Sequence, residues 1–574
     1  MKRFFKNLSD HPEGVILAVI LLFTCLNWVL LSTAEKLGPP DVYKLYEVAQ
    51  KLYSGDWKIG IVPPLFPLIQ FPVSKMLGLF MNPLDAFVLA GRLISLVAGL
   101  GVLLFSYLLL KKFTGRHALL GILLLVISPW YLKLLAFPIT DMLYLFFVSM
   151  TFYFFLKPGK KALFGVIIGV CGGVLTRFEG VLLFFSTFLN YFKFKKKEFF
   201  MLLASLPVLG ALLFFFFKFN DRFFAHFRDI ILPRQSYLFM FQHPLDFLNV
   251  IYGNILFFIP FTYPYGFKLA LLLVVLALFG YGVYRLFKME RTFTIAVLVY
   301  ELLFMAVKGY VNTAKPEIEF RRVVSGLWIF YFFCFIGAFF FLQKVKGQGK
   351  LKTTVYVAAS LLLIVLAVSV PLTAPLGTIV IFPAVLVLAL LLKNSHDSKS
   401  DKWLYKLPVL LVVLIFLLQV FYFSFVKTRE YMISMAPKAP YAAAQWLNSM
   451  RLEGGTVILS YTDNLMMGFY LDKQGAGAQD IRWETFTVPL IISQETKAQY
   501  IDAFFKEIRE RQVDYIIFDN YVVPEPEFVN INQAKRMLYE EKENKTYFRV
   551  KKYLFYKGKN VGYILKPADA QTNH

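Results

Sequence analysis

Carboxylates and arginines stand at the ends of long apolar runs in this sequence, where membrane helices would begin or end. Asp41 follows the first run, Asp141 opens the fourth, and Arg177 and Glu179 fall in a short polar break between two further runs. A carboxylate can act as a general base, and a guanidinium can donate paired hydrogen bonds to an anionic group. These residues gather on one predicted side of the membrane, as an externally open cavity would need.

Each of these residues also has a purely structural explanation. Asp41 follows two prolines and precedes a predicted helix, so it could serve as an N-cap, and Asp141 could do the same one residue after Thr140. Arg177 and Glu179 could form an ion pair that allows a hairpin tip to lie in the membrane. The residue types alone therefore leave capping and catalysis both open.

The composition places these residues in a membrane protein. Of the 574 residues, 58% are hydrophobic and only 17% are charged, against the quarter that is usual in a soluble domain. The apolar residues come in uninterrupted runs, which are typical of membrane-spanning helices. We therefore predict a polytopic α-helical protein whose first run, starting at Val15, is retained as a helix.

Hydropathy predicts about 13 transmembrane helices within a membrane domain that covers residues 1–429. The predicted spans are 14–34, 86–110, 118–133, 139–156, 162–176, 180–192, 199–219, 268–287, 292–308, 323–343, 354–371, 376–392 and 408–426. A cytoplasmic N-terminus places residues 430–574 on the extracytoplasmic side of a plasma or inner membrane.

The basic residues agree with this topology. Lys and Arg outnumber Asp and Glu by 61 to 37, which gives a net charge of +24. In a soluble protein such an excess suggests a nucleic-acid partner. Here the basic clusters, such as Lys111-Lys112 and Lys160-Lys161, separate apolar runs and all fall on the predicted cytoplasmic side. They indicate contact with membrane lipids and no nucleic-acid partner.

Three segments outside the long spans carry further structure. The first external loop, about 35–85, contains an amphipathic pattern typical of a helix lying along the membrane interface. The 31 residues between Lys161 and Lys193 are too few for two full spans, which predicts a short hairpin with a recessed tip. Residues 430–574 alternate strand-like and helical runs, which indicates a soluble α/β domain.

The order of several short motifs resembles the GT-C superfamily of membrane glycosyltransferases, in the branch containing protein O-mannosyltransferases and the lipid A aminoarabinose transferase. The similar stretches are Asp41-Val42-Tyr43, Gly55-Asp56-Trp57, Pro63-Pro64-Leu65-Phe66-Pro67, Gly91-Arg92-Leu93-Ile94-Ser95, Ile139-Thr140-Asp141 and Leu175-Thr176-Arg177-Phe178-Glu179-Gly180. They cover the first 190 residues in order.

This resemblance implies an inverting transferase that moves a sugar from a polyprenyl-phosphate-linked donor to a lipid, glycan or protein acceptor on the extracytoplasmic face. Asp41 is then the expected catalytic base, and Asp141 is expected to help shape the acceptor site. Basic residues are expected to hold the carrier phosphate. Many relatives have a basic residue directly before the Pro-Pro pair, where this chain has Val62.

The phosphate contact is therefore left to a short set of basic residues, with Glu179 as a possible sugar contact: Arg177, Lys58, Lys315, Arg321 and Arg322. The two adjacent arginines could instead be interfacial anchors that reach to lipid headgroups. No cofactor is certain, because no complete set of metal ligands is visible and a divalent cation stays open.

A transporter or lipid flippase is the alternative from another functional class. Transporters usually contain inverted repeats and place their polar sites near the middle of the membrane, in broken helices. This sequence shows no clear internal repeat, and its candidate residues gather at one predicted face. We therefore favour the transferase.

Overall fold

The computed structural model describes two separate groups of helices and strands. The described residues are 12–35, 40–56, 62–177, 179–194, 265–314, 324–346, 425–426, 428–429, 432, 438–449, 457–461, 482–484, 508, 510–519, 538, 548–556 and 559–567. One compact unit contains Met1–Lys36 and Leu45–Ser434, and the second contains Leu37–Lys44 and Met435–His574. Three predicted spans, 199–219, 354–371 and 376–392, lie outside the described residues, as does nearly all of 408–426.

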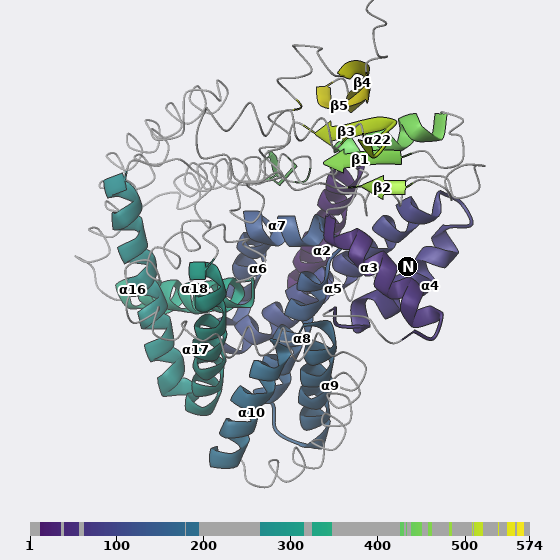
Figure 1. The fold of residues 1–574 in the computed structure, drawn as a ribbon. Helices are drawn as coiled ribbons and strands as arrows, with labels where there is room; N and C mark the ends of the chain where they lie inside the picture. Colours follow the sequence, from purple (N-terminus) through teal and green to yellow (C-terminus); the bar gives the residue numbers. More distant parts are fainter. Residues whose placement is uncertain are drawn as a thin grey trace, which may run out of the picture. The chain divides into compact units, whose positions relative to one another are not determined.

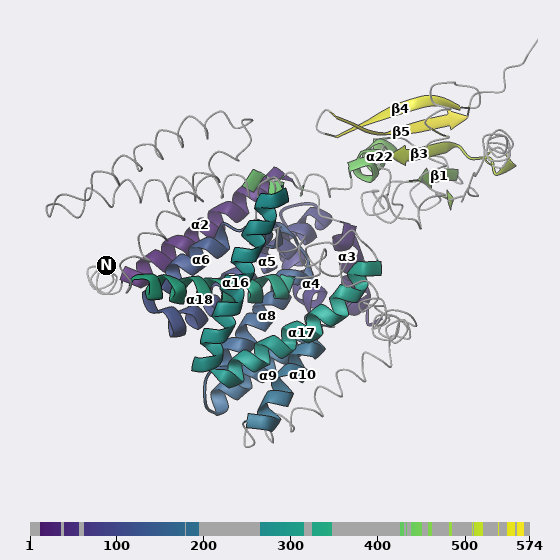
Figure 2. The same ribbon diagram turned by 90° about the vertical axis from the view of Figure 1, so that its left-hand side faces the viewer.

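The described part of the first unit is helical (Figures 1 and 2). Its helices are α2 (Pro12–Ala34), α3 (Pro40–Tyr53), α4 (Leu65–Leu77), α5 (Pro83–Thr114), α6 (Ala118–Val126), α7 (Pro129–Ala136), α8 (Thr140–Phe155), α9 (Lys160–Thr176), α10 (Gly180–Phe194), α16 (Tyr265–Met289), α17 (Arg291–Ala314) and α18 (Val324–Lys346). The first turn of α3 belongs to the second unit. Within the described residues, three helical stretches are long and apolar enough to cross a membrane: Glu13–Ala34, Pro83–Val126 and Ser325–Lys344. These helices fit a helical membrane protein.

The predicted single span at 118–133 is wrong. Helix α6 ends at Val126, and α7 starts at Pro129, because proline lacks a backbone N–H and disfavours helical geometry in the residue before it. Helix α7 is in turn bent by 118° relative to α8. The side chains of Trp130 and Tyr131 have no exposed surface. The run therefore folds as a short helix followed by a buried segment that lies across the neighbouring helices.

Two other predictions about local structure are confirmed. The amphipathic pattern in the first external loop forms α3, and its apolar positions Val42, Leu45, Ala49 and Leu52 are all buried. The short hairpin forms from α9 and α10. At its tip a Cβ atom on Gly180 would overlap the backbone of α9, so the two helices approach too closely for any larger residue there.

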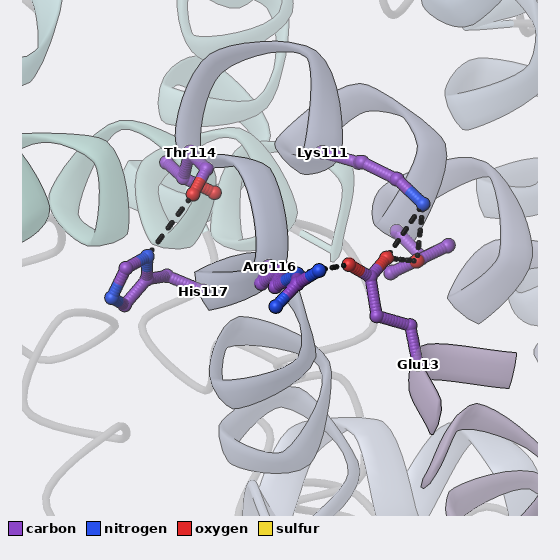
Figure 3. A network of polar contacts seen from close by, with 6 residues as sticks. Glu13, Lys111, Thr114, Arg116 and His117 are labelled. Atoms are coloured by element: carbon purple, nitrogen blue, oxygen red, sulfur yellow. Dashed lines mark hydrogen bonds and ion pairs between the residues drawn. The ribbon is translucent and has the colours of Figure 1, made fainter. Parts of the chain in front are cut away.

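Ion pairs join the helices at one end of the bundle, which we call the basic end (Figure 3). Glu13 of α2 accepts from Lys111 at 2.6 Å and pairs with Arg116 at 3.0 Å. Lys112 pairs with Glu290, between α16 and α17, at 2.5 Å. Two basic clusters that are far apart in the sequence therefore lie at the same end of the helices, as the predicted topology requires.

The opposite end, which we call the carboxylate end, is held by the Gly91–Ser95 motif of α5. Arg92 donates to the carbonyl of Ser32 in α2 at 3.0 Å, and Ser95 donates to the carbonyl of Phe137 at 2.7 Å. The absence of a side chain at Gly91 leaves room for Gln70 of α4. This motif therefore fixes α2, α4 and the segment that leads into α8.

Helices α16 and α18 cross with their backbones in contact. A Cβ atom on Gly282 of α16 would overlap the backbone of Phe333, and one on Gly337 of α18 would overlap the carbonyl of Leu278. Close crossings between small residues are a common way for membrane helices to gain packing contacts. The crossing needs glycine on both helices.

The second unit contains a five-stranded sheet with the order β2-β1-β3-β5-β4. The strands are β1 (Val457–Tyr461), β2 (Arg482–Glu484), β3 (Tyr515–Asp519), β4 (Phe548–Tyr556) and β5 (Lys559–Pro567). The β1 strand is parallel to β2 and β3, whereas β4 and β5 form an antiparallel hairpin that adds to β3. Helix α22 (Lys438–Ser449) packs Ala443 and Leu447 against Ile458 and Ile564 of the sheet.

Replacement of Gly282 by alanine should destabilise the α16–α18 crossing, because the added methyl group would overlap backbone atoms that cannot move independently. We expect Gly282→Ala to lower the free energy of unfolding by about 1–3 kcal/mol, the range for overpacking. Gly280→Ala is the matched control, since no atom lies within 4 Å of its added Cβ on the same helix. Thermal unfolding in detergent would measure both variants, and equal melting temperatures would contradict the crossing.

Candidate active site

Asp141 is buried in the first turn of α8, with 2% of its surface exposed. The chain enters α8 in extended conformation through Ile139, which is the N-cap residue and makes no side-chain capping bond. The carboxylate of Asp141 pairs instead with the guanidinium of Arg177. The side chain of Asp141 therefore points toward the α9–α10 hairpin.

Arg177 connects two carboxylates from different parts of the chain. Its Nε and Nη2 atoms donate to the two oxygens of Glu179 at 3.2 and 3.1 Å, while Nη1 faces Asp141. The side chains of Arg177 and Glu179 are 19% and 14% exposed. We call these residues the charged trio. With two carboxylates and one guanidinium, its formal charge is −2 + 1 = −1.

Each member of the trio lies at the helix end that favours its charge. Asp141 is in the first turn of α8, and Glu179 directly precedes α10. Arg177 follows the last residue of α9. The N-terminus of a helix carries a partial positive charge and the C-terminus a partial negative charge. Both carboxylates and the guanidinium are therefore stabilised by the backbone as well as by one another.

A chain of buried hydroxyl groups joins the trio to α17 and α18. The guanidinium of Arg177 lies over the ring of Tyr144, 5.9 Å from its centroid. The hydroxyl of Tyr144 is 2.7 Å from that of Tyr300, which in turn donates to Ser325 at 2.9 Å. All three hydroxyl-bearing residues are buried. Helices from both halves of the sequence therefore support the position of the trio.

The helices that meet at the hydroxyl chain continue beyond it for different lengths. Helix α17 starts at the basic end, beside Glu290, and continues for 14 residues beyond Tyr300, to Ala314. Helix α8 extends only four residues beyond Tyr144, to Thr140. The recessed position of the hairpin tip in a membrane stays a prediction.

Asp41 lies in the first turn of α3, where its side chain is half-buried beside the fully buried Val42. This turn groups with the second unit, whereas the charged trio belongs to the first. The other predicted contacts, Lys58, Lys315, Arg321 and Arg322, lie outside the described residues.

Three features of the helical bundle were missed in the sequence. Tyr144 and Tyr300 are separated by 156 residues, and tyrosines are common in this chain, so nothing in the sequence pairs them. Glu301 is an acidic residue inside the apolar run of α17, and its carboxylate lies against Gly326 of α18. Lys133 is buried in α7. A lone charge in an apolar run is costly in a membrane and could have marked both charged residues as candidates.

Within the described ranges, no three His, Cys, Asp or Glu side chains come together in a way that would hold a metal ion. The two carboxylates of the trio share Arg177 as their countercharge.

Removal of the positive charge from the trio should be strongly destabilising. We expect Arg177→Gln to cost about 3 kcal/mol, because two carboxylates would remain close together without a cation. The loss should be smaller in an Asp141→Asn background, and a double-mutant cycle from thermal unfolding in detergent would measure the coupling. Arg116→Gln is the control, since Arg116 pairs with Glu13 but is 84% exposed. A simple sum of the two single effects would contradict the pairing.

Comparison with known proteins gives one family match and several similar folds. Residues 63–219 match the family described as dolichyl-phosphate-mannose-protein mannosyltransferase. A search of curated proteins finds no match. The crystal structure of ArnT from Cupriavidus metallidurans in the apo state is similar at a TM-score of 0.54 and 13% identity, covering 97% of this chain and 98% of that one.

Two further solved structures are less similar. The archaeal oligosaccharyltransferase AglB from Archaeoglobus fulgidus has a TM-score of 0.46 at 12% identity, covering 99% of this chain and 75% of that one. The Pmt1–Pmt2 complex of S. cerevisiae has a TM-score of 0.30 at 16% identity, covering 38% and 34%. The family match over residues 63–219 and the fold shared with ArnT agree with the resemblance found in the sequence.

Proposed function

We propose that this protein is an integral membrane glycosyltransferase that moves a sugar from a polyprenyl-phosphate-linked donor to an acceptor hydroxyl, with inversion at the sugar. The observation that carries the proposal is the family match over residues 63–219, whose name specifies a lipid-linked sugar donor. This segment contains the whole charged trio, which lies at the carboxylate end of the bundle. The acceptor is a lipid, a glycan or a protein.

In the proposed reaction, Asp41 takes the proton from the acceptor hydroxyl as the acceptor oxygen attacks the anomeric carbon. The bond between that carbon and the phosphate oxygen breaks, and its electron pair leaves with the polyprenyl phosphate. General-base assistance of this kind typically accelerates a reaction by about 10²–10⁴-fold. Negative charge grows on the departing phosphate, so fixed cations near it would stabilise the transition state.

The charged trio changes the role that we assign to Arg177. Its guanidinium already pairs with two carboxylates and the group carries a net formal charge of −1, so it offers little positive potential to a phosphate. We assign Arg177 to positioning Asp141 and Glu179, whose remaining acceptor capacity suits sugar or acceptor hydroxyl groups. The phosphate contact then falls to Lys58, Lys315, Arg321 or Arg322. A divalent cation, if one is bound, would supply further positive charge at that phosphate.

The proposed topology follows from the predicted spans and the charge distribution. The N-terminus lies in the cytoplasm of a multi-pass plasma or inner membrane, and residues 430–574 form an extracytoplasmic domain. Support for one common side comes from the basic end, where Lys111 pairs with Glu13 and Lys112 with Glu290. The sheet packed with α22 supports a separate C-terminal domain.

One observation favours the alternative, a transporter or flippase. The helix break at Pro129 and the 118° bend between α7 and α8 resemble the discontinuous helices that form transporter sites. The two functions differ in whether a covalent bond is cleaved. Reconstituted protein with a radiolabelled polyprenyl-phosphate sugar separates them, since a transferase releases free polyprenyl phosphate and a transporter moves the intact lipid between leaflets.

Asp41→Asn should reduce release of polyprenyl phosphate in this assay by about 10²-fold or more, because the amide cannot accept the acceptor proton. Asp85→Asn is the matched control, since Asp85 is an exposed carboxylate in the first turn of α5, within the same predicted external segment. The control should retain activity close to that of the unmodified protein. Full activity of the Asp41 variant, or lipid movement without cleavage, would overturn the proposal.

A further inference from the structure

The cations at the basic end fall into two groups that differ in their countercharges. Lys111, Lys112 and Arg116 each pair with a carboxylate, and Figure 3 shows two of these pairs. Three cations of α16 and α18 have no carboxylate within pairing distance among the described residues. We call them the α16–α18 basic cluster: Arg285, Lys288 and Lys344. The positive charge of this cluster is therefore open to an anion that the described part of the chain does not supply.

Tyr284 of α16 brings the three cations of this cluster together. Lys288 bonds to its hydroxyl group, and Arg285 and Lys344 lie close enough to that hydroxyl to interact with it electrostatically. The ammonium group of Lys288 also lies 4.5 Å from the centroid of the Tyr284 ring. Helices α16 and α18 therefore present their cations to one place at the basic end.

The guanidinium of Arg285 is held against α18. Its Cζ atom lies 4.5 Å from the centroid of the Phe340 ring, one turn beyond the crossing at Gly337. The Nε atom of Arg285 is buried and has no hydrogen-bond acceptor among the described residues. A buried donor without an acceptor is costly, and a guanidinium matches the geometry of a phosphate group. The position of Arg285 therefore favours a ligand that carries phosphate oxygens.

An exposed apolar face of α16 leads away from the cluster along the helix. Leu273 is 60% exposed, Leu276 41% and Tyr284 50%, and a Cβ atom added to Gly280 between them would meet no atom within 4 Å. Residues spaced by three or four lie on one side of a helix. From Leu273 to Tyr284 this face is about 16 Å long, close to half of the roughly 30 Å hydrocarbon core. The α16 face therefore has the length of one leaflet.

We propose that the α16–α18 basic cluster binds the phosphate group of an anionic phospholipid, one of whose acyl chains lies along the α16 face. The phosphate oxygens accept hydrogen bonds from Arg285, Lys288 and Lys344, which supplies the missing countercharge. A soluble phosphate compound would leave the apolar face unused, whereas a lipid matches both the cations and the length of the face. Basic pockets between membrane helices are typical sites for anionic headgroups. This inference does not depend on the proposed transferase activity.

Native mass spectrometry of the purified full-length protein in detergent would measure the binding. Phosphatidylglycerol and phosphatidylcholine with identical acyl chains are titrated separately, because both contain a phosphodiester and only the first has a net charge. The variants are Lys288→Gln and Lys344→Gln, whose side chains are exposed. Lys157→Gln is the matched control, since the Lys157 ammonium lies 4.4 Å from the Tyr153 ring at the end of α8, an arrangement like that of Lys288.

We expect one phosphatidylglycerol molecule to bind more tightly than phosphatidylcholine, and each replacement in the cluster to weaken its binding about fivefold. Lys288→Arg, which keeps the charge, should retain binding, and Lys157→Gln should leave it unchanged. Gly280→Phe should also weaken binding, because the ring would fill the space left for the acyl chain. Melting temperatures in detergent show that each variant is folded.

Four results would overturn the proposal. They are equal binding of the two lipids, equal effects of Lys288→Gln and Lys157→Gln, a bound protein in place of lipid, and displacement of the lipid by soluble glycerol 1-phosphate. The last result would assign the cluster to a free phosphate compound.

Discussion

The guanidinium of Arg177 pairs with carboxylates that belong to two different helix ends, and much of the described bundle depends on this arrangement. The pairing holds the start of α8 against the α9–α10 hairpin. The guanidinium also lies over the ring of Tyr144, whose hydroxyl contacts Tyr300 of α17, and Tyr300 donates to Ser325 of α18. A charge in a bilayer is tolerated when a countercharge and helix ends surround it. The geometry that allows burial of these charges also fixes their positions relative to one another.

Local patterns predicted those parts of the fold that depend on short stretches of sequence. The amphipathic repeat of α3 was visible because its buried positions recur every three or four residues. The α9–α10 hairpin was visible because the segment between Lys161 and Lys193 is too short for two full spans. The association of Asp141 with Arg177 and Glu179 at one end of the bundle was also expected from their places at helix ends. The structure adds that they are in direct contact and share a single cation.

Features that depend on distant residues or on uniform composition could not be predicted. The run around Pro129 is apolar except for Lys133, so hydropathy alone predicted one span there, and Pro129 was not used as the sign that α6 stops. The contact between Tyr144 and Tyr300 joins helices 156 residues apart and has no local signature. Helix α4 was missed for a different reason, since its apolar residues are too few for a span and it lies within the predicted external loop at about 35–85.

The glycine crossing of α16 and α18 restricts the path that the proposed lipid-linked donor could take into the bundle. At Gly282 and Gly337 the two backbones touch, and even a methyl group would not fit between them. A prenyl chain is wider than a methyl group, so it could not pass between α16 and α18 at this crossing. The proposed carrier lipid would therefore have to reach the charged trio through another gap between helices.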